Sequence, residues 1–422
     1  MANSFSKEEI VAFDQLLEGF EDQEVLSRNV SKYTTDSTTM ARTNDVIWRP
    51  QPYISQSYDG LDQTANFGDY TQLSVPATIG FIKSVPWVMD SLELCDALQE
   101  KRLGSSAKQK LASDINIAIM NVASLQGTLV VPVATAAGDY DDVALCDSLM
   151  NEQGVVPFDR YLALSSRDYN GMASNLVGTA RSFGNNKSDK AYERSYVGMV
   201  ASFDTYKLDY ANRIAAAGGG ATNIDTQAAA GNYYVPRGTS TASTGEVSNV
   251  DNRYQTITVD NSVGVAAGDA FTIVGVEAVH HITKASTGQL KTFRVISVPS
   301  STTLVISPPI ISAQGGTDAE LQYQNCIVTP DASADFDWLN SAAANINPFW
   351  QKDALEILPG RLAVPTDAGA AVMRGTTSNG IEIVMQKQYN ILTSKTFFRV
   401  DTHFGVVNKQ PEMSGILLFG QT

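Results

Sequence analysis

The sequence predicts an α+β fold that is interrupted by an all-β domain, and two observations carry this prediction. Residues 228–330 are rich in Thr, Ser, Val and Gly and show short strands without a convincing helix, which is typical of a small barrel or sandwich. On both sides of this block, helical and strand patterns are mixed, as in α+β domains. With 422 residues and 43% hydrophobic composition, the chain is long enough for two or three domains.

The composition and the first residues argue against several classes of protein. The chain has 45 acidic and 30 basic residues and a formal net charge of −15, whereas tight nucleic-acid binding needs a surplus of Lys and Arg. Attraction to an anionic membrane is disfavoured for the same reason. Lys7, Glu8 and Glu9 stand where a signal peptide would have its apolar run. The apolar stretch from Leu129 is too short to span a bilayer, so we expect a soluble intracellular protein.

Residues 6–27 read as an acidic amphipathic helix. Ser6 and Glu9 have the spacing of a capping box, and an apolar stripe follows at helical spacing. In the first 30 residues, seven acids oppose two bases. The segment is either a solvated helix with one packed face or an arm that docks on another subunit, because little local sequence could cover its stripe. The stripe consists of Ile10, Phe13, Leu17 and Phe20.

Residues 48–83 read as a long hairpin of irregular strands, with aromatic residues and Gly-Asp turns. An isolated two-stranded ribbon is marginally stable in water. The ribbon must therefore lie on its own domain or on a neighbouring subunit, and the composition favours neither. The residues that we expect at such a contact are Trp48, Arg49, Tyr53, Phe67 and Tyr70.

The clearest helix spans residues 105–125, with Ser105 as its cap and Gly127 as its stop. Its apolar positions fall on more than one face, which predicts cover on more than one side. A helix over DDVALCDSLMNEQG, a buried strand RYLALS, a helix over SRDYNGMASNL and a strand pair in YVGMVASFDTYKL follow. Gly218, Gly219 and Gly220 read as a flexible hinge, and no Lys-Ser or Lys-Thr follows to make a phosphate loop.

Within the β block, residues alternate as in half-buried strands. Ile257 and Val259 point inward, the Gly268-Asp269 pair makes a turn, and Phe271 resumes the inner face. After Pro330, DASADFDWLNSAAANI predicts a helix. The stretches DALEILPGRLAVP and GIEIVMQKQYNILTSKTFFRVDTHFGVV predict strands.

A search for chemistry finds no assembled site. His280 and His281 are adjacent and would face opposite ways on a strand, and His403 is distant, so all three read as surface or barrel-end residues. Asp251 and Asp269 could meet and hold a cation, an alternative that the sequence leaves open. We predict no catalytic, cofactor or metal site, because no nucleophile, zinc or phosphate-loop motif occurs. Cys95, Cys146 and Cys326 match no C-x-x-C spacing, which predicts neither a disulfide framework nor a zinc site.

The order of these parts resembles the major coat protein of short-tailed double-stranded DNA bacteriophages, in the branch that carries an inserted barrel. Four stretches carry the resemblance: NVDNRYQTITV and GVAAGDAFTIVGV near the start of the insertion, NPFWQKDALEILPGRLAVP after it, and RVDTHFGVVNKQPEMSGILL near the end. The resemblance implies a tailed-phage major capsid fold. Its expected parts are an N-terminal arm (1–45), an extended loop (46–85), a peripheral domain (86–135, with a spine helix at 105–126, and closing strands 379–422), an axial domain (136–227 and 331–378) and an inserted β-barrel domain (228–330).

The resemblance also implies a function, which is self-assembly into pentamers and hexamers of an icosahedral shell. Such a shell would enclose double-stranded DNA without sequence-specific binding, would be assembled in the bacterial host cytoplasm with a scaffolding protein and a portal, and would be a virion component without cofactors or a membrane. Some relatives weld their shells through a lysine in the extended loop. Here that loop has only Lys83 at its base, so we expect no covalent cross-link.

A loop before the first barrel strand reaches a neighbouring subunit in the barrel-bearing branch. The matching stretch is Ser240 to Arg253. The resemblance therefore makes Glu246, Asp251 and Arg253 candidates for an ion pair between capsomers, with a merely solvated loop as the alternative. Two other functions stay open: the shell of a cellular nanocompartment that encloses an enzyme, and a β-rich binding module. An acidic hydrolase lacks any assembled site.

Overall fold

The computed structural model describes residues 9–11, 13–14, 17, 26–33, 46–52, 54–55, 57, 59–64, 67–68, 70–90, 97–177, 194–195, 197–225, 233–364, 369–377 and 380–421. The chain forms two compact units. Unit 1 comprises residues 1–47, 77–119 and 355–407, and unit 2 comprises 48–76, 120–354 and 408–422. Each unit therefore collects segments that lie far apart in the sequence.

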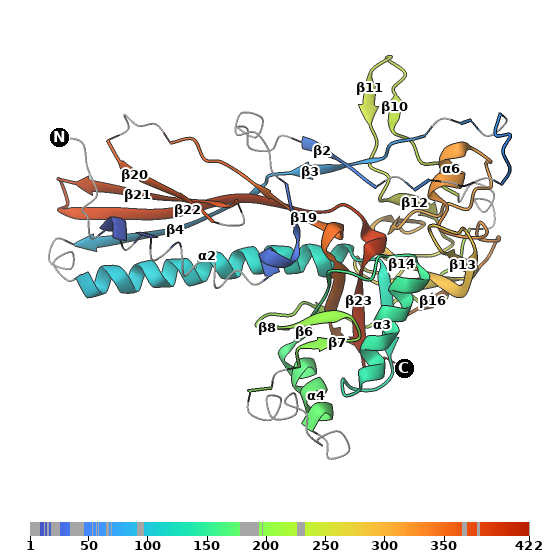
Figure 1. The fold of residues 1–422 in the computed structure, drawn as a ribbon, viewed down its shortest axis with the longest axis horizontal. Helices are drawn as coiled ribbons and strands as arrows, with labels where there is room; N and C mark the ends of the chain where they lie inside the picture. Colours follow the sequence, from blue (N-terminus) through green and yellow to red (C-terminus); the bar gives the residue numbers. More distant parts are fainter. Residues whose placement is uncertain are drawn as a thin grey trace. The chain divides into compact units, whose positions relative to one another are not determined.

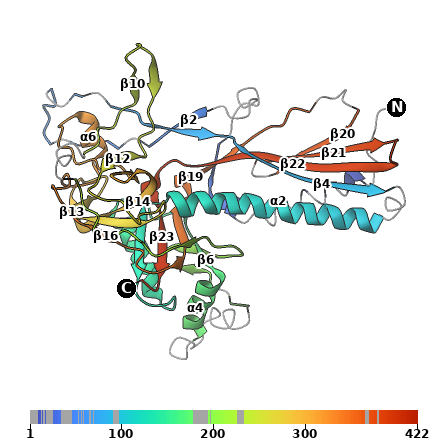
Figure 2. The ribbon, with the colours of Figure 1, turned by 180° about the vertical axis from the view of Figure 1, so that it is seen from behind.

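Unit 1 is built on a sheet around the long strand β22 (Lys395–Asn408). The antiparallel strands β21 (Glu382–Asn390) and β20 (Ala371–Thr376) follow on one side, and β4 (Phe81–Asp90) also pairs with β22. Figure 2 shows these strands side by side. Strand β19 (Leu355–Pro359) joins β22 to the short parallel strand β1 (Ser31–Lys32), which follows the 3-10 helix η1 (Leu26–Asn29). Trp87 on β4 stacks on Phe398 of β22, with ring centroids 5.5 Å apart, so a cross-strand aromatic pair supports the register.

The long helix α2 (Ala97–Gln126) has 30 residues and begins eight residues before the predicted start. The two-unit division falls inside it, after Ile119. Leu111 and Ile115 are buried as expected, and so is the second apolar set with Ile119 and Met120, which confirms cover on more than one side. Leu125 was expected on the buried face but is half exposed. The helix ends at Gly127, where an added Cβ would lie 2.9 Å from the Ala123 carbonyl oxygen.

Unit 2 contains a six-stranded mixed sheet that carries two helices. The strands run in the order β5 (Leu129–Val133), β23 (Ser414–Phe419), β18 (Asn347–Gln351), β6 (Arg160–Ser165), β8 (Phe203–Leu208) and β7 (Met199–Val200). Helices α3 (Tyr140–Glu152) and α4 (Ser166–Val177) pack on it. Their apolar faces share one core with the strands, including Val143, Cys146, Leu162, Phe203 and Phe349. The predicted helix, strand, helix and strand pair of this region are confirmed.

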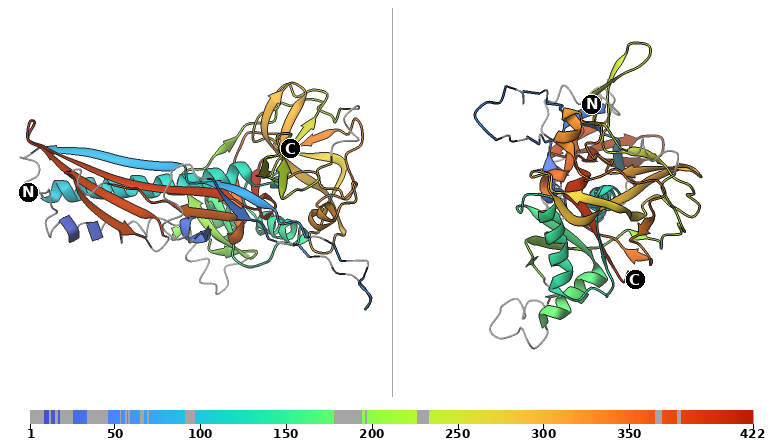
Figure 3. Two further views of the ribbon diagram at one scale, coloured as in Figure 1. Left: turned by 90° about the horizontal axis from the view of Figure 1, so that it is seen from above. Right: turned by 90° about the vertical axis from the view of Figure 1, so that its right-hand side faces the viewer.

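A second sheet in unit 2 holds the predicted β block. Its five antiparallel strands run in the order β12 (Gln255–Thr258), β15 (Thr303–Ser307), β14 (Ser286–Ser300), β13 (Ala270–Val279) and β16 (Phe336–Trp338). Ile257, Phe271 and Ile273 lie in its core, as the alternation predicts. In the described part of the chain, the two edge strands β12 and β16 do not pair with each other. The sheet is therefore curled but open (Figure 3), and the strands on either side of Gly268-Asp269 are not adjacent.

The structure corrects the helix that was predicted over residues 331–346. That stretch holds β16 and the short strand β17 (Ala344–Asn345), which pairs with β9 (Arg213–Ile214). Phe336 stacks on Phe271 with centroids 4.5 Å apart. Burial of this aromatic ring and pairing with β13 override the helical pattern of Leu339, Ala342 and Ile346.

Three further expectations need correction. A short helix, α6 (Asp318–Tyr323), lies inside the block that was expected to have none; its capping box, Thr317 and Glu320, was readable in the sequence. Of the three glycines expected to form a flexible hinge, Gly219 is closely packed, since an added Cβ would lie 2.5 Å from the Trp338 indole, whereas Gly220 has nothing within 4 Å. The last strand, β23, was expected among the peripheral closing strands but belongs to the six-stranded sheet of unit 2.

The remaining elements are short. Strands β2 (Val46–Pro50) and β3 (Ser74–Thr78) pair with each other, as do β10 (Thr239–Thr241) and β11 (Val247–Asn249). The 3-10 helices η5 (Lys352–Ala354) and η6 (Pro411–Met413) precede β19 and β23. Within the described residues, no helix is long and apolar enough to cross a membrane. Figure 1 shows these elements along the chain.

Candidate subunit interface

The extended loop, defined here as residues 51–73 between β2 and β3, exposes large apolar side chains. Leu61 is fully exposed, Phe67 is 88% exposed and Tyr70 is 59% exposed. Local hydrogen bonds shape the loop: Gln63 Nε2 donates to the Asp59 and Gly60 carbonyl oxygens at 3.1 and 2.6 Å. The loop therefore has a defined turn but leaves Leu61, Phe67 and Tyr70 exposed to water.

The root of this loop, in contrast, is anchored. The Gln51 amide donates to the Leu73 carbonyl oxygen at 2.9 Å, and Gln72 Nε2 donates to the Gln51 carbonyl oxygen at 2.8 Å. Leu73 is 3% exposed and packs with Ile311 and Tyr323. The expected long hairpin is thus paired only near its ends, and the described residues 51–73 form no strand.

The hairpin, defined here as residues 239–249, projects from unit 2 (Figure 1). Its strands β10 and β11 pair Thr239 with Asn249 and Thr241 with Val247. All its side chains are exposed. Gly245 has a φ of +84° at the turn, a backbone conformation that favours glycine, and the Ala242 amide closes the turn on the Glu246 carbonyl oxygen at 2.9 Å. The Glu246 side chain is thus carried into solvent.

Asp251 and Arg253 lie at the root of this hairpin and pair with each other. Arg253 Nε and Nη2 lie 2.9 and 2.7 Å from Asp251 Oδ1 and Oδ2, a bidentate fork. Arg253 Nη1 also donates to the Asn408 carbonyl oxygen at 2.9 Å, and the guanidinium lies over the Tyr254 ring. Arg253 is 8% exposed. Of the three residues predicted for a contact between capsomers, Glu246 is exposed, whereas Asp251 and Arg253 form an ion pair within the chain.

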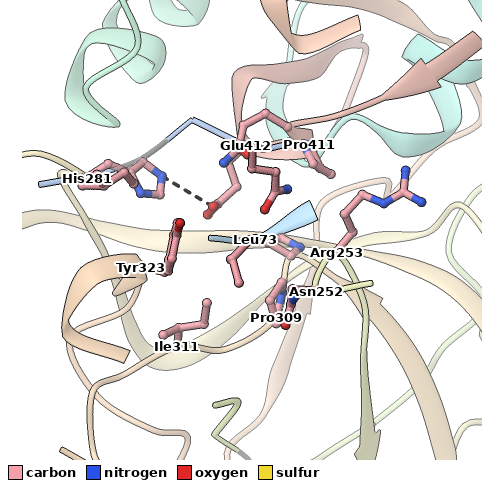
Figure 4. Close-up of a pocket in the computed structure, with 13 residues that line it drawn as sticks. Leu73, Asn252, Arg253, His281, Pro309, Ile311, Tyr323, Pro411 and Glu412 are labelled. Carbon is pink, nitrogen blue, oxygen red and sulfur yellow. Dashed lines mark ion pairs between the residues drawn. The ribbon is translucent and has the colours of Figure 1, made fainter. Parts of the chain in front are cut away.

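Next to these roots lies a cavity of about 40 Å³ (Figure 4). Its lining comes from both roots, from the β block and from η6, and includes Gln51, Leu73, Asn252, Arg253, His281 and Glu412. A space of this size has room for a few water molecules and for nothing larger. The geometry therefore favours a packing junction of several segments over a ligand site.

A buried ion pair adjoins the cavity. Lys291 is 1% exposed, and its Nζ lies 2.5 Å from Glu412 Oε1 and 3.1 Å from Gln153 Oε1. Asn325 Nδ2 donates to the same carboxylate oxygen at 3.1 Å. Burial by itself would raise the pKa of Glu412, but Lys291, His281 and these hydrogen bonds lower it to about 2. Glu412 is therefore ionised at neutral pH.

His281 faces this carboxylate, with Nε2 3.6 Å from Glu412 Oε2 (dashed line in Figure 4). The pKa of His281 is lowered to about 4, mainly by burial; Glu412 raises it, and Lys291, Lys284 and His280 lower it. The imidazole is therefore neutral at pH 7. His403, which was expected at the surface, is 1% exposed in unit 1, so that expectation is wrong.

The arm partly finds cover in its own chain. The described residues between 9 and 17 are helical, Glu9 pairs with Lys387, and an added Cβ at Gly375 would lie 3.1 Å from both Phe13 and Leu17. Phe13 is 5% exposed. The expectation that the stripe cannot be covered within one chain is therefore wrong for Phe13. Ile10 is 44% exposed and stays a candidate contact.

The other predicted contact residues differ in their placement. Trp48 and Arg49 are half-buried on β2, and Tyr53 and Phe20 lie outside the described residues. No described group of three or more His, Cys, Asp and Glu side chains could hold a metal ion. Asp251 pairs with Arg253, whereas Asp269 accepts from Asn340 Nδ2 at 2.9 Å. Each of the two carboxylates that the sequence considered for a cation site thus has a partner within the protein.

Sequence reasoning missed the root residues Gln51 and Asn252 and the neighbouring ion pair of Lys291 and Glu412. Asn252 Oδ1 accepts from Tyr234 Oη and from the Arg237 amide, both at 3.0 Å, and Lys291 lies 121 residues before its partner. One signal in the sequence could have pointed to this ion pair. Lys291 lies among apolar residues in a strand, and a Lys is rarely buried without a partner.

Comparison with known proteins finds one family model that matches almost the whole chain. The model of the P22 coat protein family (gene protein 5) matches residues 1–420. Among solved structures, the chain is similar to the capsid of cyanophage P-SCSP1u (TM-score 0.44, 10% identity, covering 93% of this chain and 86% of that chain). It is also similar to the mature capsid of bacteriophage PhiM1 (TM-score 0.41, 10% identity, 99% and 88%). The CUS-3 coat protein I-domain is 38% identical over 28% of this chain and 94% of that chain (TM-score 0.21).

Proposed function

We propose how a shell is built from this protein, starting from the premise that the chain belongs to the P22 coat protein family and is a structural major capsid protein that assembles into an icosahedral shell. Our proposal is that the extended loop and the hairpin are the two segments that reach neighbouring subunits. A contact between two different surfaces, repeated around rotation axes, closes into rings and shells. Several modest contacts per subunit are sufficient because they act together.

One observation carries the loop contact: Leu61 and Phe67 are almost fully exposed although the loop root is anchored. Exposed apolar side chains on a held segment are typical of interaction sites. In the assembled shell, we expect these two side chains and Tyr70 to be buried against a second copy. Tyr53, Trp48 and Arg49 remain candidates for the same contact.

For the hairpin, Glu246 is the residue that we propose meets a neighbouring capsomer. Its side chain is exposed at the turn, so it can reach a cation on another copy without breaking a contact of its own chain. Asp251 and Arg253 remain candidates from the sequence, but their mutual pairing favours a role in holding the hairpin.

The arm is proposed to serve a different partner. The first 30 residues carry seven acids and two bases, and Asp14 and Ile10 are exposed. This surface suits a basic amphipathic helix of a scaffolding protein. We further propose assembly in the host cytoplasm, a portal at one vertex and packaged DNA held without sequence-specific contacts, because a net charge of −15 disfavours tight phosphate binding. We also propose that the chain divides into arm, extended loop, peripheral, axial and inserted domains.

The experiment that tests this proposal compares two variants by sedimentation and electron microscopy. Leu61→Ser with Phe67→Ser should abolish shell formation while the thermal unfolding of the unassembled protein is unchanged. Val263→Ser is the matched control, since Val263 is also exposed (69%) but lies outside the loop. Normal shells from the double variant would reject the loop contact. Particles that contain a cargo enzyme in place of DNA would favour the nanocompartment alternative.

The absence of a covalent cross-link stays a prediction. Lys83 is the only Lys or Arg between Arg49 and Arg102 other than Lys101. Intact particles should therefore dissociate to single chains in hot detergent on a gel, and a ladder of multimers would contradict this.

A further inference from the structure

We propose that Arg253 and Asp251 form a clamp that holds the roots of the extended loop and of the hairpin together, so that the two segments move as one. Arg253 is then a positioning residue and not a contact residue. The consequence for assembly rests on the proposed function. The clamp itself belongs to the single chain and can be tested before assembly.

The hairpin root is the first half of the clamp. Asp251 is held by the Arg253 fork at 2.7 to 3.2 Å. The neighbouring Asn252 is 5% exposed, and its Nδ2 donates to the Arg237 carbonyl oxygen at 2.8 Å, across the base of the hairpin. Arg253 therefore fixes one strand of the root, and Asn252 ties the other strand to it.

The second half is a segment that serves both roots. Arg253 Nη1 donates to the Asn408 carbonyl oxygen at 2.9 Å, and Gln51 Nε2, from the loop root, donates to the next carbonyl oxygen, that of Lys409, at 2.8 Å. This segment is itself fixed, since the Lys409 amide donates to the Ala354 carbonyl oxygen at 2.8 Å. Asn408 Nδ2 also donates to Ser414 Oγ at 2.9 Å. The consecutive carbonyl groups of Asn408 and Lys409 thus hold the hairpin root through Arg253 and the loop root through Gln51.

The roots also touch directly. Ser74, at the end of the loop, forms a parallel backbone bridge with Asp251. Gly238 lies so close to the loop that an added Cβ would be 3.1 Å from the Gln72 carbonyl oxygen. A shift of Asp251 must therefore displace Ser74, and no side chain separates the two roots at Gly238.

Arg253 suits this role for a physical reason. Its planar guanidinium can donate to two carboxylate oxygens and to a backbone carbonyl at once, and its side chain is almost fully buried. A lysine could satisfy only part of this geometry with one ammonium group. If the Asp251 carboxylate moves, the Arg253 guanidinium that binds it must move too. Arg253 then displaces the Asn408–Lys409 backbone, which also holds Gln51.

The test measures backbone hydrogen exchange in the full-length, unassembled protein. Two amides report on the roots: Gln51, which donates to Leu73, and Val250, which donates to the Gly238 carbonyl oxygen at 3.4 Å. We expect Arg253→Met to speed exchange at both amides by about ten-fold or more, since local opening governs exchange, and Arg253→Lys to lie between that variant and the unchanged protein. Faster exchange at Val250 with unchanged exchange at Gln51 would overturn the clamp.

Two controls make the result specific. Glu246→Gln, at the exposed turn, should leave both amides unchanged. Arg374→Met removes a surface ion pair with Glu382 (2.9 Å) in unit 1 and should also leave them unchanged. If Arg253→Met does not fold, exchange at the same two amides is measured in Asp251→Asn, which keeps the shape of the side chain and removes its charge. Unchanged exchange at Gln51 in that variant would equally reject the proposal.

A second readout separates the clamp from the proposed function. Arg253→Met should lower the yield of shells although Leu61, Phe67 and Glu246 are intact. If both amides lose protection and shells still form normally, the clamp stands and the proposed contacts of loop and hairpin are contradicted.

Discussion

The tips and the roots of the extended loop and of the hairpin differ in solvent exposure and in their contacts. The tip residues Leu61, Phe67 and Glu246 are exposed, whereas Leu73, Asn252 and Arg253 at the roots are at most 8% exposed and lie among side chains and carbonyl groups of distant segments. The comparison teaches that each segment has two parts in different environments. Tip side chains are exposed, and root side chains are buried among groups of distant segments. Substitutions should therefore affect association at the tips and the stability of the chain at the roots.

The largest effect is expected next to the roots, at the buried Lys291. Lys291→Met should destabilise the unassembled protein by about 3–5 kcal/mol, because Glu412 is left buried without its main partner. Urea unfolding measures this. Lys110 pairs with Asp114 at 2.9 Å but its side chain is 63% exposed, so Lys110→Met should cost less than about 1 kcal/mol. Equal costs for the two variants would show that burial of the pair is unimportant.

At the roots, Asn252→Ala should cost about 1–3 kcal/mol, because Arg237 and Tyr234 lose buried partners. Asn249, on β11, is exposed, and Asn249→Ala should change the free energy of unfolding by about 0.5 kcal/mol or less. Urea unfolding of both variants gives the comparison. If Asn252→Ala proved as stable as Asn249→Ala, burial of the root residue would not matter for stability.

Acid should weaken the junction through His281. Its pKa is lowered to about 4 in the folded chain, against about 6.5 in an unfolded chain. The unfolded chain therefore binds the extra proton first, so this contribution to stability is complete above pH 6.5 and is lost as the pH falls towards 4. Thermal unfolding across pH 4–7 measures the slope, and His281→Gln should flatten it. An unchanged slope in that variant would assign the acid sensitivity to other groups. Glu412, whose pKa is lowered from about 4.5 to about 2, makes a contribution to stability that is complete above about pH 4.5 and is lost only as the pH falls from there towards 2.

The smallest effect on stability is expected at the tips. Leu61→Ser and Glu246→Gln should each change the free energy of unfolding by about 0.5 kcal/mol or less, since neither side chain is buried. Urea unfolding of the unassembled protein checks this, and shell yield is measured on the same samples. A clear loss of stability in either variant would mean that the tips, too, hold the chain together.

The buried thiols give a simple check on the core of unit 2. Burial raises the pKa of Cys326 to about 12 and that of Cys146 further. Neither thiolate forms near neutral pH, so a thiol reagent should label both only after unfolding. Rapid labelling of Cys146 in the folded protein would contradict the packing of α3.

Much of the fold could be predicted from the sequence because the responsible signals are local. The period of the helix that became α2, the alternation at Ile257 and Phe271, and the cap and stop signals depend on residues a few positions apart. The helix expected over residues 331–346 failed for the opposite reason, since Phe336 is held by Phe271, 65 positions earlier in the sequence. Two of the tip residues that we propose as contacts, Phe67 and Tyr70, could be selected from the sequence, because aromatic residues stand out in a ribbon that is only marginally stable alone.

The sequence by itself determined the α+β character, the β block, the projecting loop and the acidic arm, because these follow from periodicity and composition. Only the tertiary structure decided that Phe13 is covered within its own chain, that Arg253 pairs with Asp251 and holds Asn408, and that Lys291 meets Glu412. The physical reason is that a buried polar group needs a partner, and that partner is set by how distant segments pack, which no local pattern records.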